Sequence, residues 1–137
     1  MSEENVEIVR RIAAQMPACY RTGGVTEAVR ELLAPGFYVD ASHRIFNPDV
    51  YEGADGMQRM IREVNDAWED FRETTERILD AGEKVVVIQT ICGRGRASGL
   101  EVQARGALVY TVTAGQIGSV EVYTDAEQAL EAAGPKG

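Results

Sequence analysis

The segment from Tyr51 to Phe71, YEGADGMQRMIREVNDAWEDF, constrains the fold more than any other part of the chain. Its apolar residues recur at steps of three and four, which places them on one face of a helix. They are Met57, Met60, Ile61, Val64, Ala67, Trp68 and Phe71. An aromatic residue and a tight glycine turn precede the helix, and Asp55 followed by Gln58 suits a helix start. The pattern predicts a long amphipathic helix with a buried stripe.

Two helices and one strand are expected before this segment. Pro17 predicts that the first helix ends or kinks there, because proline cannot donate the helical hydrogen bond. Gly23-Gly24 closes that segment, and Thr26 suits the N-cap of a second, short helix. Pro35-Gly36 is expected to stop the second helix, and Phe37–Ser42 to form a strand. The residues from 43 to 51 are predicted to be an irregular loop.

Long strands are expected after the main helix, because alternating or continuous apolar runs are separated by glycine turns. The expected strands are Arg72–Asp80, Lys84–Arg96, Glu101–Thr113 and Gln116–Thr124. Val85–Ile88 is consecutively apolar, which is typical of a strand buried on both faces. Asp125, with Gln128 three residues on, suits the start of a last helix that Gly134-Pro135 ends. Four consecutive antiparallel strands beside helices predict an α+β fold with a pocket between the layers.

Composition limits the class of partner. The chain has 137 residues, which predicts one domain over residues 1–137, and a formal net charge of −8. A negative charge disfavours nucleic acid and anionic membranes, because phosphates require a basic surface. No apolar run approaches the ~20 residues of a membrane span, and the acidic start SEENVEIVRR does not resemble a signal peptide. A cytoplasmic location is therefore expected, with Cys19 and Cys92 as free thiols.

No cofactor or metal site is expected from the motifs. The Gly93-Arg94-Gly95 run lies between strands and opens no helix, so it is not a phosphate-binding loop. One histidine and no closely spaced acidic cluster argue against a dedicated metal site.

The order of these elements, the turn and helix YEGADGMQRMI, and the closing GQIGSVEVYTDAEQAL resemble the SnoaL-like branch of the NTF2-like superfamily over nearly the whole chain. The resemblance implies a cone-shaped α+β fold, in which a curved antiparallel sheet wraps around the N-terminal helices and encloses an apolar pocket. It also implies a homodimer paired through the sheet. Relatives include polyketide cyclases, ketosteroid isomerases, limonene-epoxide hydrolases, dehydratases and non-catalytic domains, so the fold implies a pocket and no single reaction.

Polar positions of these relatives fall on apolar residues here. The final-strand aspartate of the epoxide hydrolases corresponds to Val122, and their first-strand tyrosine and asparagine correspond to the region of Val39 and Ala41. The isomerase general base also corresponds to the region of Ala41. Their Arg-x-Asp pair corresponds to Gln89–Cys92, which holds neither residue. We therefore expect Val39, Ala41 and Val122 to be apolar lining of the pocket.

His43 is the only histidine, and it continues the face of Val39 and Ala41 toward the inner rim. Histidine changes charge near neutral pH, so His43 is the candidate proton shuttle, and Asp40 the candidate that orients it. The alternatives are a loop histidine bonded to backbone or water and an exposed Asp40 paired with Arg44. Asp40 and Glu121 are expected outside the pocket, although a register shift of one residue would turn both inward.

Three further side chains are candidate ligand contacts. Gln89 shares a face with apolar residues and requires a polar partner, which is either a ligand or a neighbouring backbone group. Tyr51 is placed to stack over the mouth, and Trp68 either contacts a ligand or packs in the core. Two functions remain open: an enzyme of the cyclase, isomerase or hydrolase type acting on a hydrophobic small molecule, and a non-catalytic ligand-binding or assembly domain.

Overall fold

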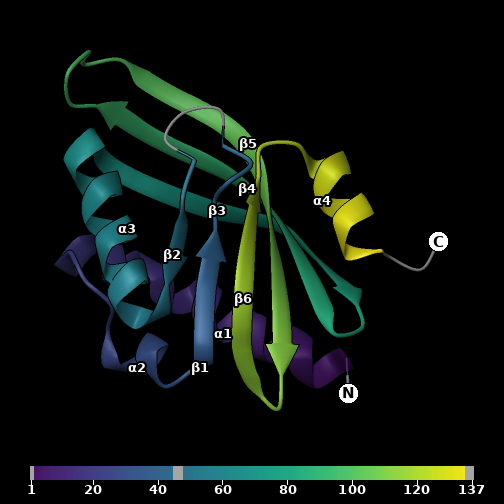
Figure 1. Cartoon of the computed structure of the whole chain (residues 1–137). Helices are drawn as coiled ribbons and strands as arrows, with labels where there is room; N and C mark the ends of the chain where they lie inside the picture. The colour runs from purple at the N-terminus through teal and green to yellow at the C-terminus, as the bar shows by residue number, and fades with distance from the viewer. Residues whose placement is uncertain (1, 45–47, 135–137) are drawn as a thin grey trace.

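The computed structural model of the chain describes residues 2–44 and 48–134. Its ten elements in chain order are α1 (Ser2–Thr22), α2 (Glu27–Arg30), β1 (Leu33–Asp40), β2 (Val50–Glu52), α3 (Gly53–Ala67), β3 (Trp68–Ala81), β4 (Lys84–Gly95), β5 (Glu101–Thr113), β6 (Gln116–Tyr123) and α4 (Ala126–Ala133). The fold is α+β, as predicted, with one mixed sheet and helices on both of its faces (Figure 1). No helix in the described residues is long and apolar enough to span a membrane.

The sheet has six strands in the order β2-β1-β6-β5-β4-β3, and it is curved and does not close into a barrel. The predicted antiparallel run of β3, β4, β5 and β6 is confirmed. β1 pairs with β6 in parallel, however, so the sheet is mixed rather than purely antiparallel. β1 therefore depends on a partner more than 75 residues away in the chain, which local sequence patterns do not report.

Both faces of the sheet are buried at its centre. Val85 and Val87 belong to the larger core, which includes apolar residues of α1, α2 and α3. Val86 and Ile88 belong to the smaller core under α4. The prediction of a strand buried on both faces is thus confirmed for β4. The helices α1 and α3 cover one face and α4 the other, which leaves α1 opposite the inner side of β3, β4 and β5.

Helix α1 continues through Pro17 and ends at Thr22, so the first of the two predicted effects of Pro17, an end of the helix there, was wrong. The alternative, a kink at Pro17, stays a prediction. Pro17 is exposed, while Met16 and Cys19 on either side are buried in the larger core. Burying each apolar side chain contributes about 1.5–3 kcal/mol, which together offsets a proline penalty of about 3 kcal/mol.

Helix α3 is shorter than its apolar stripe suggests. It covers Gly53–Ala67, and Trp68 and Phe71 already belong to β3. Residues three apart point to opposite faces of a regular strand, but β3 has a register shift between Glu69 and Arg72, and Trp68 and Phe71 both line the same cavity. The three-residue step therefore continues past the end of the helix, and periodicity alone misplaced the boundary. The N-cap is Glu52, which makes no side-chain capping bond, so Asp55 is not the cap. By contrast, Thr26 and Asp125 cap α2 and α4 as predicted.

The first strand begins earlier than predicted, at Leu33, and Pro35-Gly36 lies inside it. The three-residue β2 falls in the segment predicted to be an irregular loop. It pairs with β1 through Val39 and Tyr51, so both of these residues are held at the edge of the sheet and buried beneath α3.

Candidate functional site

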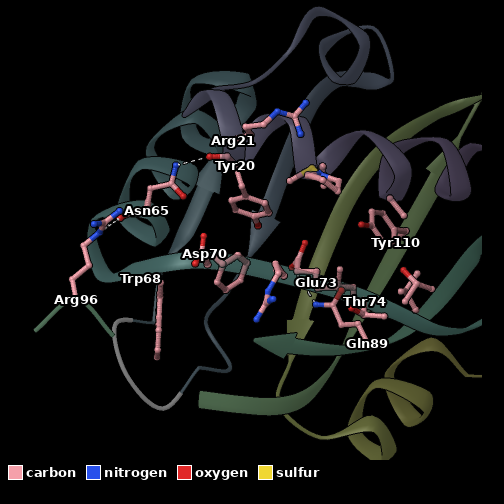
Figure 2. Close-up of a pocket in the computed structure, with 18 residues that line it drawn as sticks. Tyr20, Arg21, Asn65, Trp68, Asp70, Glu73, Thr74, Gln89, Arg96 and Tyr110 are labelled. Carbon is pink, nitrogen blue, oxygen red and sulfur yellow. Dashed lines mark hydrogen bonds between the residues drawn. The ribbon is translucent and has the colours of Figure 1, made fainter. Parts of the chain in front are cut away.

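A cavity of about 680 Å³ lies between α1 and the inner face of the sheet (Figure 2). Its walls come from α1, the end of α3, and strands β3, β4 and β5. The lining includes both polar and apolar side chains: Ala13, Met16, Pro17, Tyr20, Arg21, Asn65, Trp68, Asp70, Phe71, Arg72, Glu73, Thr74, Thr75, Val87, Gln89, Arg96, Leu108 and Tyr110. A volume of this size accommodates a small organic molecule.

Glu73 is one of two acidic residues that line this cavity, and Asp70 is the other. Glu73 lies opposite Ile91 in the β3–β4 ladder, and its side chain is half-buried among the lining residues. Burial raises the pKa of Glu73 to about 7, although a hydrogen bond from Gln89 Nε2 to Glu73 Oε2 at 3.2 Å partly opposes this. A carboxyl group with this pKa exchanges its proton near neutral pH, which is the property of a general acid or base.

Two tyrosines accompany Glu73. Tyr20 extends from α1 and Tyr110 from β5, and both line the cavity (Figure 2). Burial, and then the nearby Glu73, raise the pKa of both phenols well above the usual value, so both stay protonated at physiological pH. Neither hydroxyl makes a hydrogen bond within residues 2–44 and 48–134. Every fully buried side-chain nitrogen or oxygen atom in these residues has a hydrogen-bond partner, so the two unbonded hydroxyls are not fully buried. Both hydroxyls are therefore open to the cavity and able to donate to a ligand.

The wall of the cavity near Tyr20 is held by polar contacts between distant segments. Asn65 at the end of α3 donates from Nδ2 to the Tyr20 carbonyl at 2.9 Å. Arg96, just after β4, donates from Nε to the Asn65 carbonyl at 2.7 Å. The Tyr20 ring also packs on Phe71 of β3, with ring centroids 4.8 Å apart. These contacts fix the position of the Tyr20 side chain relative to β3.

Two of the predicted ligand contacts, Gln89 and Trp68, line the cavity. Gln89 is buried and uses its amide to bond Glu73, which gives the polar partner that the sequence required. Trp68 begins β3 and packs against Gly93, where an added Cβ would lie 3.3 Å from Trp68 Cε3. The roles of both residues in ligand binding stay predictions.

The other predicted lining residues lie elsewhere in the larger core. Val39 and Ala41 are fully buried on β1 and directly after it, and Val122 packs against the same core. Tyr51 is also fully buried, and its hydroxyl donates to Glu63 Oε1 at 2.7 Å and accepts from Arg44 at 3.3 Å. None of these four residues is among the residues that line the cavity.

His43 and Asp40 are not brought to the cavity either. His43 is exposed, and its ring stacks on Tyr123 with centroids 4.5 Å apart. Tyr123 belongs to the smaller core under α4, which is the face of the sheet opposite the cavity. Asp40 lies beside His43 on that face, as the expected strand register requires. The proposed proton-shuttle role of His43 therefore receives no support from the cavity geometry.

Sequence reasoning missed Glu73 and gave Tyr20 and Tyr110 no specific role. The available signal was alternation in β3, where Phe71, Glu73 and Thr75 share the inward face. A single carboxylate among inward positions stands out only once the strand is known to start at Trp68. The misplaced end of α3 concealed this pattern.

Comparison with known proteins identifies the fold. Residues 13–120 match the family described as the SnoaL-like domain. A putative SnoaL-like polyketide cyclase from Jannaschia sp. CCS1 is 18% identical, with a TM-score of 0.74 over 100% of this chain and 96% of that one. An NTF2-like protein of unknown function from Burkholderia pseudomallei K96243 is 20% identical, with a TM-score of 0.73 over 96% and 97%.

A third solved structure, from Catenulispora acidiphila, has a ketosteroid isomerase-like fold and was crystallised with trimethylamine. It is 17% identical, with a TM-score of 0.65 over 95% of this chain and 94% of that one. No curated protein matches the chain. At these identities the likeness establishes the fold, and the chemistry has to be argued from the residues.

Proposed function

Because the chain belongs to the SnoaL-like domain family, we propose that it is an acid–base enzyme that moves a proton on a largely apolar small molecule containing a carbonyl group. The observation that carries the proposal is Glu73, a cavity carboxyl whose pKa is raised to about 7 by burial. Polyketide cyclase and ketosteroid isomerase-like proteins are among the similar structures.

In the proposed reaction, the Glu73 carboxylate removes a proton from the carbon next to the carbonyl. The electron pair of the broken C–H bond forms a C=C bond, and negative charge develops on the carbonyl oxygen. Glu73 then returns the proton to another carbon in an isomerisation, or to an oxygen after the carbanion attacks a second carbonyl in a cyclisation. Gln89 holds the Glu73 carboxyl through their hydrogen bond. A pKa near the working pH suits both directions of proton transfer.

The tyrosines supply the second half of the proposed chemistry. The phenols of Tyr20 and Tyr110 remain protonated at physiological pH, and their hydroxyls make no hydrogen bond within the described residues. Each hydroxyl is therefore a candidate donor to the developing oxyanion. Donors that are already in place inside a cavity stabilise such charge without reorganisation, and loss of one typically costs about 10²–10³ in kcat.

The proposal is tested with 5-nitrobenzisoxazole, a general probe for a carboxylate base in an apolar environment. A base removes its carbon-bound proton, the N–O bond breaks, and a coloured phenolate is released. We expect the protein to accelerate this reaction, with kcat/KM rising through about pH 7 as Glu73 ionises. Glu73→Gln is expected to abolish the acceleration.

Glu76→Gln is the matched control. Glu76 lies three residues further along the same strand, but it bonds Thr90 and Arg105 and is exposed. Removing the Glu76 carboxylate is expected to leave the rate of the 5-nitrobenzisoxazole reaction unchanged. Equal rates for the wild-type protein and Glu73→Gln, with both folded by circular dichroism, would contradict the enzyme proposal.

A second candidate function is a non-catalytic binding domain. It is favoured by the apolar Val39, Ala41 and Val122, which replace the polar groups of catalytic relatives and pack into the core. In that case 5-nitrobenzisoxazole would compete with other small apolar ligands for the cavity, without any acceleration dependent on Glu73.

A further inference from the structure

Asp40, His43 and Glu121 form a cluster on the face of the sheet opposite the cavity. Asp40 at the end of β1 and Glu121 in β6 are direct neighbours in the parallel ladder. His43 lies three residues after Asp40, in the turn that follows β1. One oxygen of each carboxylate and one imidazole nitrogen all lie within 4.8 Å of one another. Pairing of β1 with β6 therefore brings Glu121 to two side chains that are about 80 residues away from it in the sequence.

The separation of these atoms suits coordination. A zinc ion binds imidazole nitrogen and carboxylate oxygen at about 2.0–2.2 Å, so ligand atoms around it lie about 3–4 Å apart. The three ligand atoms, all within 4.8 Å of one another, lie close to that spacing. One nitrogen and two oxygens are a donor set that suits divalent transition ions better than calcium or magnesium, which prefer oxygen alone.

Neighbouring groups orient all three side chains. The His43 ring stacks on Tyr123 at an interplanar angle of 19°. The Tyr123 hydroxyl donates to Glu121 Oε2 at 3.2 Å, and the Ser42 backbone N–H donates to Asp40 Oδ1 at 2.9 Å. Such outer contacts are typical of metal sites, where they orient the ligands.

The charge of the cluster also suits a cation. In the part of the chain that the structure describes, neither Asp40 nor Glu121 makes an ion pair with lysine or arginine. Two neighbouring carboxylates on strands of one sheet repel each other unless a positive charge lies between them. The whole chain carries a net charge of −8, which further favours cation uptake.

We propose that Asp40, His43 and Glu121 bind one divalent transition-metal ion, with Zn²⁺ as the best-suited ion. The ion holds the end of β1, the turn after it and β6 together. Three protein ligands leave one position open to water or to an external ligand. The site is separate from Glu73 and stands on different residues, so it does not depend on the proposed enzyme activity.

The test uses the full-length protein without a histidine tag, titrated with ZnCl₂ at pH 7.5 and observed by NMR. Because the sequence contains one histidine, the imidazole C–H signals report His43 alone. We expect these signals to shift and saturate at one equivalent of Zn²⁺, and Mn²⁺ to broaden them selectively. Isothermal titration is expected to give the same stoichiometry.

Asp40→Asn and Glu121→Gln are each expected to weaken Zn²⁺ binding by about tenfold or more. Glu7→Gln, which removes an exposed carboxylate on α1, is the matched control and is expected to leave the affinity unchanged. No shift of the His43 signals at saturating Zn²⁺ would overturn the proposal. An unchanged affinity in both Asp40→Asn and Glu121→Gln would also overturn it, because His43 alone would then account for the binding.

Discussion

At the scale of single residues, Glu73 is the group on which both the proposed chemistry and an expected pH dependence of stability rest. It lines a cavity together with two phenols and two side-chain amides, and its pKa is raised from 4.5 to about 7 by burial. Placing an ionised carboxylate there is unfavourable, because burial removes the water that would solvate the charge. The same property that suits Glu73 to proton transfer therefore makes the folded state sensitive to pH.

Glu73 is expected to make the protein less stable as the pH rises from about 5 to 7. In this range the folded protein holds a proton on Glu73 that the unfolded chain releases, so its contribution is complete at acidic pH and is lost through about pH 7. The total change is about 2–4 kcal/mol in the free energy of unfolding. Urea unfolding at several pH values measures it.

The control for this pH effect is Glu73→Gln, which cannot ionise. The difference in unfolding free energy between wild type and Glu73→Gln is expected to fall by about 1.4 kcal/mol per pH unit between pH 5 and 7. A difference that stays constant over this range would show that Glu73 titrates as an ordinary exposed carboxylate. Glu76→Gln serves as the parallel variant, since the bonds from Thr90 and Arg105 hold the pKa of Glu76 below its usual value.

Tyr110→Phe is expected to reduce kcat for 5-nitrobenzisoxazole by about 10²-fold, because the variant removes one donor to the developing phenolate oxygen. KM is expected to change little, since the ring still lines the cavity. Steady-state kinetics separate the two parameters. Tyr38→Phe is the control, because Tyr38 is an exposed tyrosine on β1 and does not line the cavity. Equal losses in both variants would exclude an oxyanion role for Tyr110.

At the scale of elements, α3 depends on its buried stripe. Met57, Met60 and Ile61 are buried against the sheet, and Ile61 is fully inaccessible to solvent. Ile61→Asp is expected to destabilise the protein by about 3–5 kcal/mol, because it leaves an unpaired charge in the core. Arg62→Asp, at the next and exposed position, is expected to change stability by no more than about 0.5 kcal/mol. Thermal and urea unfolding of both variants provide the comparison.

The first turn of α3, which follows β2 directly, depends on two glycines for different reasons. Gly53 has a φ of +70°, which side chains with a Cβ rarely adopt. At Gly56 the limit is space, because an added Cβ would lie 2.6 Å from the Tyr51 carbonyl carbon. We expect Gly56→Ala to cost about 1–3 kcal/mol through the shift of backbone that it forces. Gly118→Ala, where the nearest atom would be at 3.4 Å, is the milder control.

At the scale of the whole molecule, the sheet leaves two edges, the short β2 and the 14-residue β3. Exposed strand edges and partly covered sheet faces favour association with another chain. We propose a homodimer, as the family resemblance suggests. Light scattering at micromolar concentration is expected to give about twice the 14.9 kDa mass of one chain. A mass near 14.9 kDa would contradict this assembly.

The sequence by itself determined the elements whose signals are local. The hairpins β4–β5 and β5–β6, the caps of α2 and α4, and the double burial of β4 all follow from neighbouring residues. Only the tertiary structure decided the site, because its members lie on separate elements. Parallel pairing of β1 with β6 placed Asp40 beside Glu121, and packing of α1 on the sheet placed Tyr20 near Glu73. Burial then raised the pKa of Glu73, and burial is a property of the whole fold that no local spacing of residues contains.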